Sequence, residues 1–153
     1  MELISRNIKK IGVVIGALFL IMVGVIIFAN ANRTYSASDV LGGADLNAEN
    51  PYVEIYSYDL ETEGIFTSLE IPEETQQELI KAFKNAKFKI VKDGSTDYDY
   101  VINITLNTRY TLFAVSDKKL LRSNFTNEYY TIENESDFFK ILKNFTKNNS
   151  KPE

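Results

Sequence analysis

Apolar and polar positions divide the chain into one uninterrupted apolar run and a longer stretch in which the two kinds alternate. The run covers residues 11–29 and carries no charged side chain. At ~1.5 Å rise per residue it would form roughly 28 Å of helix, close to the ~30 Å hydrocarbon core of a bilayer. The pattern therefore predicts a transmembrane helix over 11–29, followed by a domain polar enough to be soluble in water.

Positive charge before the apolar run predicts its orientation. The flank 1–10 contains three basic residues, whereas Arg33 is the only one in residues 30–80. Basic residues stay on the cytoplasmic side of a membrane helix. We therefore expect a single-pass protein of the cell membrane, with 1–10 as a cytoplasmic flank and the C-terminal domain extracytoplasmic. A cleaved signal peptide is the alternative, because Ala29-Asn30-Ala31 matches the A-x-A cleavage rule, but the run is longer than the ~7–15 residues of a signal-peptide core.

Three glycines of the apolar run have a spacing that suits helix pairing. Gly12 and Gly16 lie four residues apart, and Gly24 lies two such steps further on. Small residues at this spacing let two membrane helices approach closely, although Gly is also common in membrane helices generally. These glycines are our candidates for the face of a homodimer.

The residues beyond the run predict a linker and then an α+β domain. Residues 30–51 are rich in Ser, Ala, Asn, Asp and Gly, which is typical of a linker. Alternation of apolar and polar residues predicts strands, and apolar stripes of helical period predict one helix opened by Pro72 and one after Asn134 or Ser136. The predicted strands are 52–58, 65–71, 88–92, 100–106, 110–115, 120–125 and 129–132.

The resulting order, ββαβββββα, predicts the architecture of the domain. Strands joined by short turns favour an antiparallel sheet, and two amphipathic helices must bury their apolar stripes against one of its faces. We place this extracytoplasmic domain at 52–146, with 147–153 as a disordered tail. Its core should contain Leu79, Phe83, Phe139 and Leu142.

Charge and composition exclude several classes of function. The net charge is −4, and since the flank 1–10 contributes +2, the remainder carries −6 and would repel nucleic acid. The chain contains no His and no Cys, so Ser-His-Asp and Cys-His catalysis and the usual zinc sites are impossible. We expect no enzyme activity and no cofactor. A carboxylate pair such as Glu54 with Glu70, acting on wall material, is the remaining hydrolase hypothesis.

Three aspartates close in sequence are a candidate ion site. Asp93, Asp97 and Asp99 accompany Gly94 in one predicted loop, and Ca²⁺ accepts oxygen ligands of this kind. Their spacing does not match an EF-hand, and a solvated turn explains the same residues. A small-ligand or calcium sensor is therefore an alternative function.

Tyrosines of the first predicted strand are the candidate binding residues. Tyr52, Tyr56 and Tyr58 alternate with Val53 and Ile55, so the two sets face opposite sides of the sheet. Val and Ile suit the helix-covered side, which leaves the tyrosines to water or to a partner. We expect a module that binds an envelope protein, although tyrosines also line the cores of domains.

Four stretches of the chain resemble a domain of small envelope proteins and lipoproteins of Gram-positive bacilli. They are Asp99-Tyr100, Tyr110-Thr111-Leu112-Phe113, Tyr130-Thr131-Ile132 and residues 136–142. The resemblance covers roughly 52–145 and implies an α+β domain in the cell envelope, with no particular activity. The lipid-attachment Cys is missing, and the membrane helix would replace the lipid.

Overall fold

The computed structural model describes residues 2–58, 66–133 and 136–149. It divides into two compact units, Met1–Arg33 and Thr34–Glu153. The first unit contains the helix α1 (Glu2–Ala31). Within the part of the chain that the structure describes, no helix combines the length and the apolar character that a membrane span needs.

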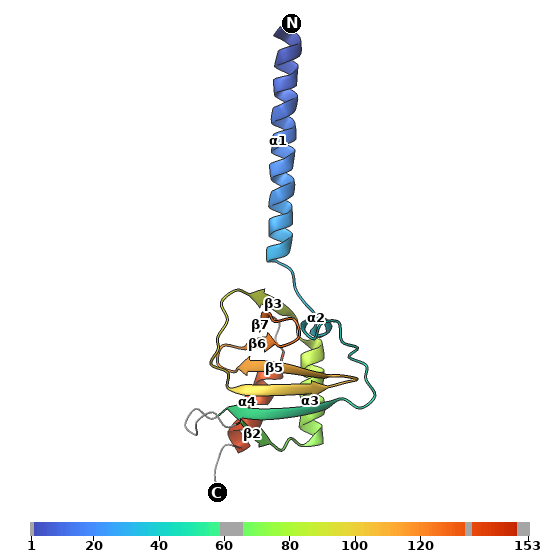
Figure 1. The fold of residues 1–153 in the computed structure, drawn as a ribbon, viewed down its shortest axis with the longest axis vertical. Coiled ribbons are helices and arrows are strands. Elements are labelled where there is room, and N and C mark those ends of the chain that lie inside the picture. The colour runs from blue at the N-terminus through green and yellow to red at the C-terminus, as the bar shows by residue number, and fades with distance from the viewer. Residues whose placement is uncertain (1, 59–65, 134–135, 150–153) are drawn as a thin grey trace. The chain divides into compact units, whose positions relative to one another are not determined.

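The second unit is built on one antiparallel sheet of seven strands, in the order β2-β1-β4-β5-β6-β7-β3. Helices α3 (Glu73–Asn85) and α4 (Phe138–Asn149) lie together behind the sheet, on one of its faces (Figure 1). This confirms the predicted α+β class and the ββαβββββα order. The strands are β1 (Tyr52–Tyr58), β2 (Phe66–Leu69), β3 (Phe88–Val91), β4 (Tyr100–Thr105), β5 (Arg109–Val115), β6 (Leu120–Ser123) and β7 (Tyr129–Ile132).

The helices form where the sequence supplies both an amphipathic stripe and suitable ends. Glu73 and Glu74 occupy the first turn of α3 and Lys84 the last, which complements the helix dipole. The apolar stripe of α3 is buried through Leu79 and Phe83. The stripe of α4 is buried next to it, so the four core residues expected from the sequence are all in the core: Leu79, Phe83, Phe139 and Leu142.

Strand β1 shows which face of the sheet is covered. Val53 and Ile55 are buried, as their place in the alternation predicts. Ile55 pairs with Ile102 of β4, which pairs with Leu112 of β5, and all three belong to the same core as Phe83. The face that carries these residues is therefore the one against α3 and α4.

The segment 30–51 differs from the linker that we expected. Its middle part forms the short helix α2 (Ala37–Val40), and Ala37, Val40 and Leu41 are buried in the core of the domain. Ser36 and Asp39 form a capping box that starts the helix. The linker interpretation was wrong here because small and acidic residues serve a helix start as well as they serve a loop.

Two contacts fix this N-terminal segment to the domain. Tyr35 and Phe88 exchange backbone hydrogen bonds of 2.7 and 2.9 Å, so residue 35 pairs with the outer edge of β3. Gly42 follows α2 with a φ of +69°, and a Cβ there would collide with the ring of Phe125. Only glycine meets both requirements without strain. The domain therefore begins at residue 34, not at 52.

The end of the chain also departs from the prediction. Helix α4 continues to Asn149, so 147–149, which we assigned to the tail, are helical. The Ser136 hydroxyl accepts a hydrogen bond from the Phe138 amide at 3.3 Å, consistent with a capping role. The other proposed cap, Asn134, and the last tail residues, 150–153, lie outside the described residues.

Candidate functional site

The face of the sheet opposite the helices carries a row of side chains that follows from strand register. Tyr56 pairs with Val101, and Val101 pairs with Phe113. Phe113 pairs in turn with Arg122, and Arg122 with Tyr129. Because paired residues project from the same side of an antiparallel sheet, these five side chains share the face that α3 and α4 leave uncovered.

Half of this uncovered face is crossed by the segment 92–99. The segment joins β3, at one edge of the sheet, to β4, and so passes β7, β6 and β5. The ring of Tyr98 lies 5.0 Å from that of Phe113, and its hydroxyl lies 3.3 Å from the hydroxyl of Tyr129. Gly94 lies so close to Tyr129 that a Cβ would collide with its ring. The segment therefore packs on β5, β6 and β7 and does not reach β1 and β2 at the other edge of the sheet.

An arginine binds the aromatic rings beneath this segment. The Arg122 guanidinium lies 5.9 Å from the Phe113 ring centre and 5.8 Å from that of Tyr129. One of its nitrogens donates to Asn127 Oδ1 at 2.6 Å. Cation–π contacts of this kind stabilise the packing of a charged side chain on rings. Arg122 is thus engaged within the domain. The sequence did not single it out, because its two ring contacts come from strand pairing that leaves no local pattern.

The open half of the face presents the predicted tyrosines. Tyr52 is 51% exposed, and Tyr56 and Tyr58 are half-buried. Phe66 of β2 is 48% exposed, and its ring packs against that of Tyr58 with 5.1 Å between centres. The structure thus brings Tyr56, Tyr58 and Phe66 to one side of the β1–β2 pair, which the register Tyr58 to Phe66 requires. Phe66 was not among the predicted site residues, although its place in the alternation of β2 was a usable signal.

A polar group of residues lies beside these rings. Thr111 Oγ1 donates to Asn103 Oδ1 at 2.7 Å, and Asn103 is buried on this face. Arg109 forms a hydrogen-bonded ion pair with Glu54. The open surface therefore combines aromatic rings with fixed polar groups, a composition that is typical of protein-binding surfaces.

The predicted carboxylate pair is not brought together. Glu54 lies on the uncovered face, in its ion pair with Arg109. Glu70 lines a depression with Glu78 of α3 and Asn144 of α4, on the helix side of the sheet. The two carboxylates thus lie on opposite faces, so this pair is not placed to act together on one bond.

The aspartate loop is partly used in folding. Asp99 Oδ2 accepts a hydrogen bond of 2.6 Å from the Ser116 amide, and the Asp99 amide donates to the Ala114 carbonyl at 2.9 Å. Asp93 and Asp97 are exposed on the crossing segment. Among the residues that the structure describes, no group of three acidic, His or Cys side chains is arranged to hold a metal ion. Asp99 therefore acts as a structural acceptor at the start of β4.

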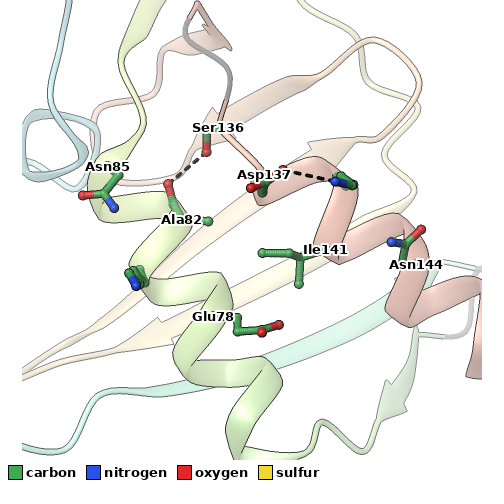
Figure 2. Close-up of a pocket in the computed structure, with 9 residues that line it drawn as sticks. Glu78, Ala82, Asn85, Ser136, Asp137, Ile141 and Asn144 are labelled. Carbon is green, nitrogen blue, oxygen red and sulfur yellow. Dashed lines mark hydrogen bonds and ion pairs between the residues drawn. The ribbon is translucent and has the colours of Figure 1, made fainter.

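A groove between α3 and α4 was not predicted from the sequence. Its lining includes Glu78 and Asn85 of α3 and Asp137, Ile141 and Asn144 of α4, which Figure 2 shows on the two helices. The groove has a volume of about 440 Å³ and a mixed lining that also includes Lys81 and Lys140.

The hydroxyl of this groove is engaged in the structure. Ser136 Oγ donates to the Ala82 carbonyl at 2.9 Å, and Lys140 lies 3.6 Å from Asp137. A nucleophilic serine would need a neighbouring general base that accepts its proton. The hydroxyl instead ties the start of α4 to α3, so the groove contains no assembled catalytic group among its described residues.

Two tyrosines have altered acidity. Burial raises the pKa of Tyr130, whose hydroxyl donates to Thr126 Oγ1 at 3.0 Å. Burial and the hydrogen bond with Tyr129 raise the pKa of Tyr98, while Arg122 opposes this rise. Both raised pKa values keep the phenol groups neutral. They result from packing within the domain, because neither ring lies in the groove or on the open half of the sheet.

The three glycines of the predicted homodimer face all lie on α1. A Cβ placed on Gly16 or Gly24 would meet no atom within 4 Å. Their role in helix pairing stays a prediction.

No family model, no curated protein and no solved structure matches this chain in comparisons with known proteins.

Proposed function

We propose that this protein is a membrane-anchored module that binds another envelope protein on the extracytoplasmic side of a bacterial membrane. The observation that carries the proposal is the open half of the sheet face, where Tyr52, Tyr56, Tyr58 and Phe66 are available to a partner. Tyrosine contributes a large apolar area together with a polar tip, and is enriched at the centres of interfaces.

The aromatic rings are confined to one part of the sheet, which supports a binding role. The segment 92–99 covers β5, β6 and β7, and α3 and α4 cover the other face of the sheet. The rings of β1 and β2 are therefore exposed at one defined place. The Asn103–Thr111 and Arg109–Glu54 pairs border them with polar groups whose positions are fixed. An apolar centre with a polar rim is the usual composition of a specific protein interface.

The anchor belongs to the same proposal. Residues 11–29 carry no charge, and they lie within a helix that extends over Glu2–Ala31. Apolar side chains of α1, such as Ile15, Phe19 and Phe28, are 60–72% exposed, which is unfavourable in water and favourable in lipid. The basic residues at 6, 9 and 10 favour a cytoplasmic N-terminus.

A bacterial envelope agrees with the composition of the chain. It contains no Cys, whereas small eukaryotic ectodomains usually rely on disulfides. The resemblance to envelope domains of Gram-positive bacilli points the same way. The bound partner would be the extracytoplasmic part of an envelope protein, and nucleic acid is disfavoured by the net charge of −4.

The test is capture of the partner from crosslinked cells by the full chain. Tyr56→Ser with Tyr58→Ser should leave the fold intact and abolish capture, because the best anchor residues of an interface contribute ~2 kcal/mol or more each. Gln77→Ser with Glu78→Ser is the matched control, since both side chains are exposed on α3, on the other side of the sheet. A folded double variant that still captures the same partner would place binding elsewhere. Unfolding of the double variant would identify the two rings as core residues.

A further inference from the structure

The most basic part of the chain is the segment 81–92. It contains five lysines and no acidic residue, within a protein whose net charge is −4. It runs from the C-terminal half of α3 through the edge strand β3. The lysines are Lys81, Lys84, Lys87, Lys89 and Lys92.

Acidic groups lie near both ends of this segment, and at one end Glu78 and Asp137 line the α3–α4 groove together with Lys81. Glu133, on the neighbouring strand connection, pairs with Lys89 at 3.3 Å. Asp93 follows the segment directly. Lys81, Lys87 and Lys92 are exposed, and the segment itself carries five positive charges and no negative one.

The chain joins α1 to the middle of this basic segment. Tyr35 pairs with Phe88, which lies between Lys87 and Lys89. Only residues 32–34 separate the end of α1 at Ala31 from this pairing. Four extended residue steps span at most ~14 Å. If α1 ends at a membrane surface, the lysines around Phe88 must therefore lie near the lipid headgroups.

We propose that the segment 81–92 binds anionic phospholipid headgroups and holds the edge of the domain at β3 against the membrane. The inference rests on the proposed anchor and adds a lipid surface to the proposed protein partner. The net negative charge of the domain does not prevent this contact, because charges further from the lipid than about 8 Å are largely screened at physiological salt. Acidic residues cluster instead around the opposite edge, where Glu70, Glu73 and Glu74 follow β2.

The test uses the full chain in vesicles of phosphatidylcholine, with or without phosphatidylglycerol. The chain has no Cys, so Asn85→Cys, between α3 and β3, and Ser68→Cys, on β2, each accept a single spin label. Collision of the label with a nickel-chelating lipid headgroup measures its proximity to the membrane. The collision rate at position 85 should rise when phosphatidylglycerol is present, and the rate at position 68 should not.

Charge variants decide whether the lysines cause the effect. Lys84→Gln, Lys87→Gln and Lys92→Gln together should return the rate at position 85 to its value in phosphatidylcholine. The matched control makes the same change of charge on the β5–β6 turn and on α4, through Lys118→Gln, Lys119→Gln and Lys147→Gln. In this control the collision rate at position 85 should still rise when phosphatidylglycerol is present. Equal rates in the two lipids, or loss of the rise in the control variant, would overturn the proposal.

Flotation of the unlabelled chain separates this proposal from the anchor. A chain that floats with phosphatidylcholine vesicles, but whose label at position 85 does not respond to phosphatidylglycerol, has a working anchor and no lipid contact at β3. A chain that does not float with either vesicle overturns both proposals.

Discussion

Ser123 and Val40, 83 positions apart in sequence, are joined by a buried hydrogen bond in which Ser123 Oγ donates to the Val40 carbonyl at 2.7 Å. The same oxygen accepts from the amides of Phe125 and Thr126, at 3.2 and 3.3 Å. One hydroxyl therefore connects α2 to β6 and shapes the turn after β6.

Replacing this hydroxyl should destabilise the domain. Ser123→Ala leaves a buried carbonyl without its donor, which costs about 1–3 kcal/mol of unfolding free energy. Ser116→Ala, at a half-buried turn position, is the control and should change stability by less than ~0.5 kcal/mol. Urea unfolding of the full chain in mild detergent measures both. An unchanged midpoint for Ser123→Ala would show that water replaces the hydroxyl.

The second prediction concerns the buried phenylalanine rings of α3 and α4. Phe83 and Phe139 are 2% and 5% exposed, so Phe83→Ala or Phe139→Ala should each lower the unfolding free energy by ~3–5 kcal/mol. Phe125→Ala, at a ring that is 60% exposed, should cost much less. The same unfolding assay compares the three, and equal losses would contradict the assignment of the core.

Gly94 tests the packing of the crossing segment. Gly94→Ala would place a methyl group into the ring of Tyr129, which is held by Arg122 and Tyr98. Overpacking of this kind costs typically ~1–3 kcal/mol. The double variant Gly94→Ala, Tyr129→Ala should lose less stability than the sum of the single variants. Additive losses would indicate that the segment does not lie on Tyr129.

Tyr130 should make the domain sensitive to alkaline pH. Burial raises its pKa above the usual value near 10, with Glu128 adding to the rise and the Thr126 hydrogen bond opposing it. Above pH 10 the unfolded chain therefore releases this proton before the folded one, so stability is full below pH 10 and falls as the pH rises further. In Tyr130→Phe the fall between about pH 9 and pH 11 should be smaller. Urea unfolding curves of both proteins at these two pH values measure the difference. Equal losses of unfolding free energy in the two proteins would show that other groups cause the pH dependence.

The fate of the N-terminus is the last prediction. Mass spectrometry of the membrane fraction should find residues 1–6 joined to the mature chain, because the apolar run 11–29 exceeds a signal-peptide core. A chain in the medium that begins at Asn32 would show cleavage after Ala31 and leave a secreted domain.

The strands and helices of the domain could be predicted because their periodicity is local. The alternation of Val53 and Ile55 with Tyr52, Tyr56 and Tyr58 was sufficient to decide which side of β1 is buried. The position of β3 beside β7 could not be predicted, since pairing between strands distant in sequence leaves no local pattern. The course of the segment 92–99 across the sheet could not be predicted for the same reason.

Helix α2 was missed although its start had a signal. Ser36 precedes Asp39 by three residues, which is the spacing of a capping box, but a helix of four residues has too little periodicity to be recognised. The candidate binding rings were found from β1 alone. Phe66 was added only when the structure placed β2 beside them.

The contacts of the N-terminal segment also determine when the domain can finish folding during its synthesis. Tyr35 and Val40 leave the ribosome early, but their partners, Phe88 and Ser123, follow only after most of the sheet has been made. Contacts between residues so distant in the chain slow folding, because the loop between them must close first. Until that loop closes, the apolar side chains of Ala37, Val40 and Leu41 are uncovered, and the N-terminal end of the domain is the last part to be completed.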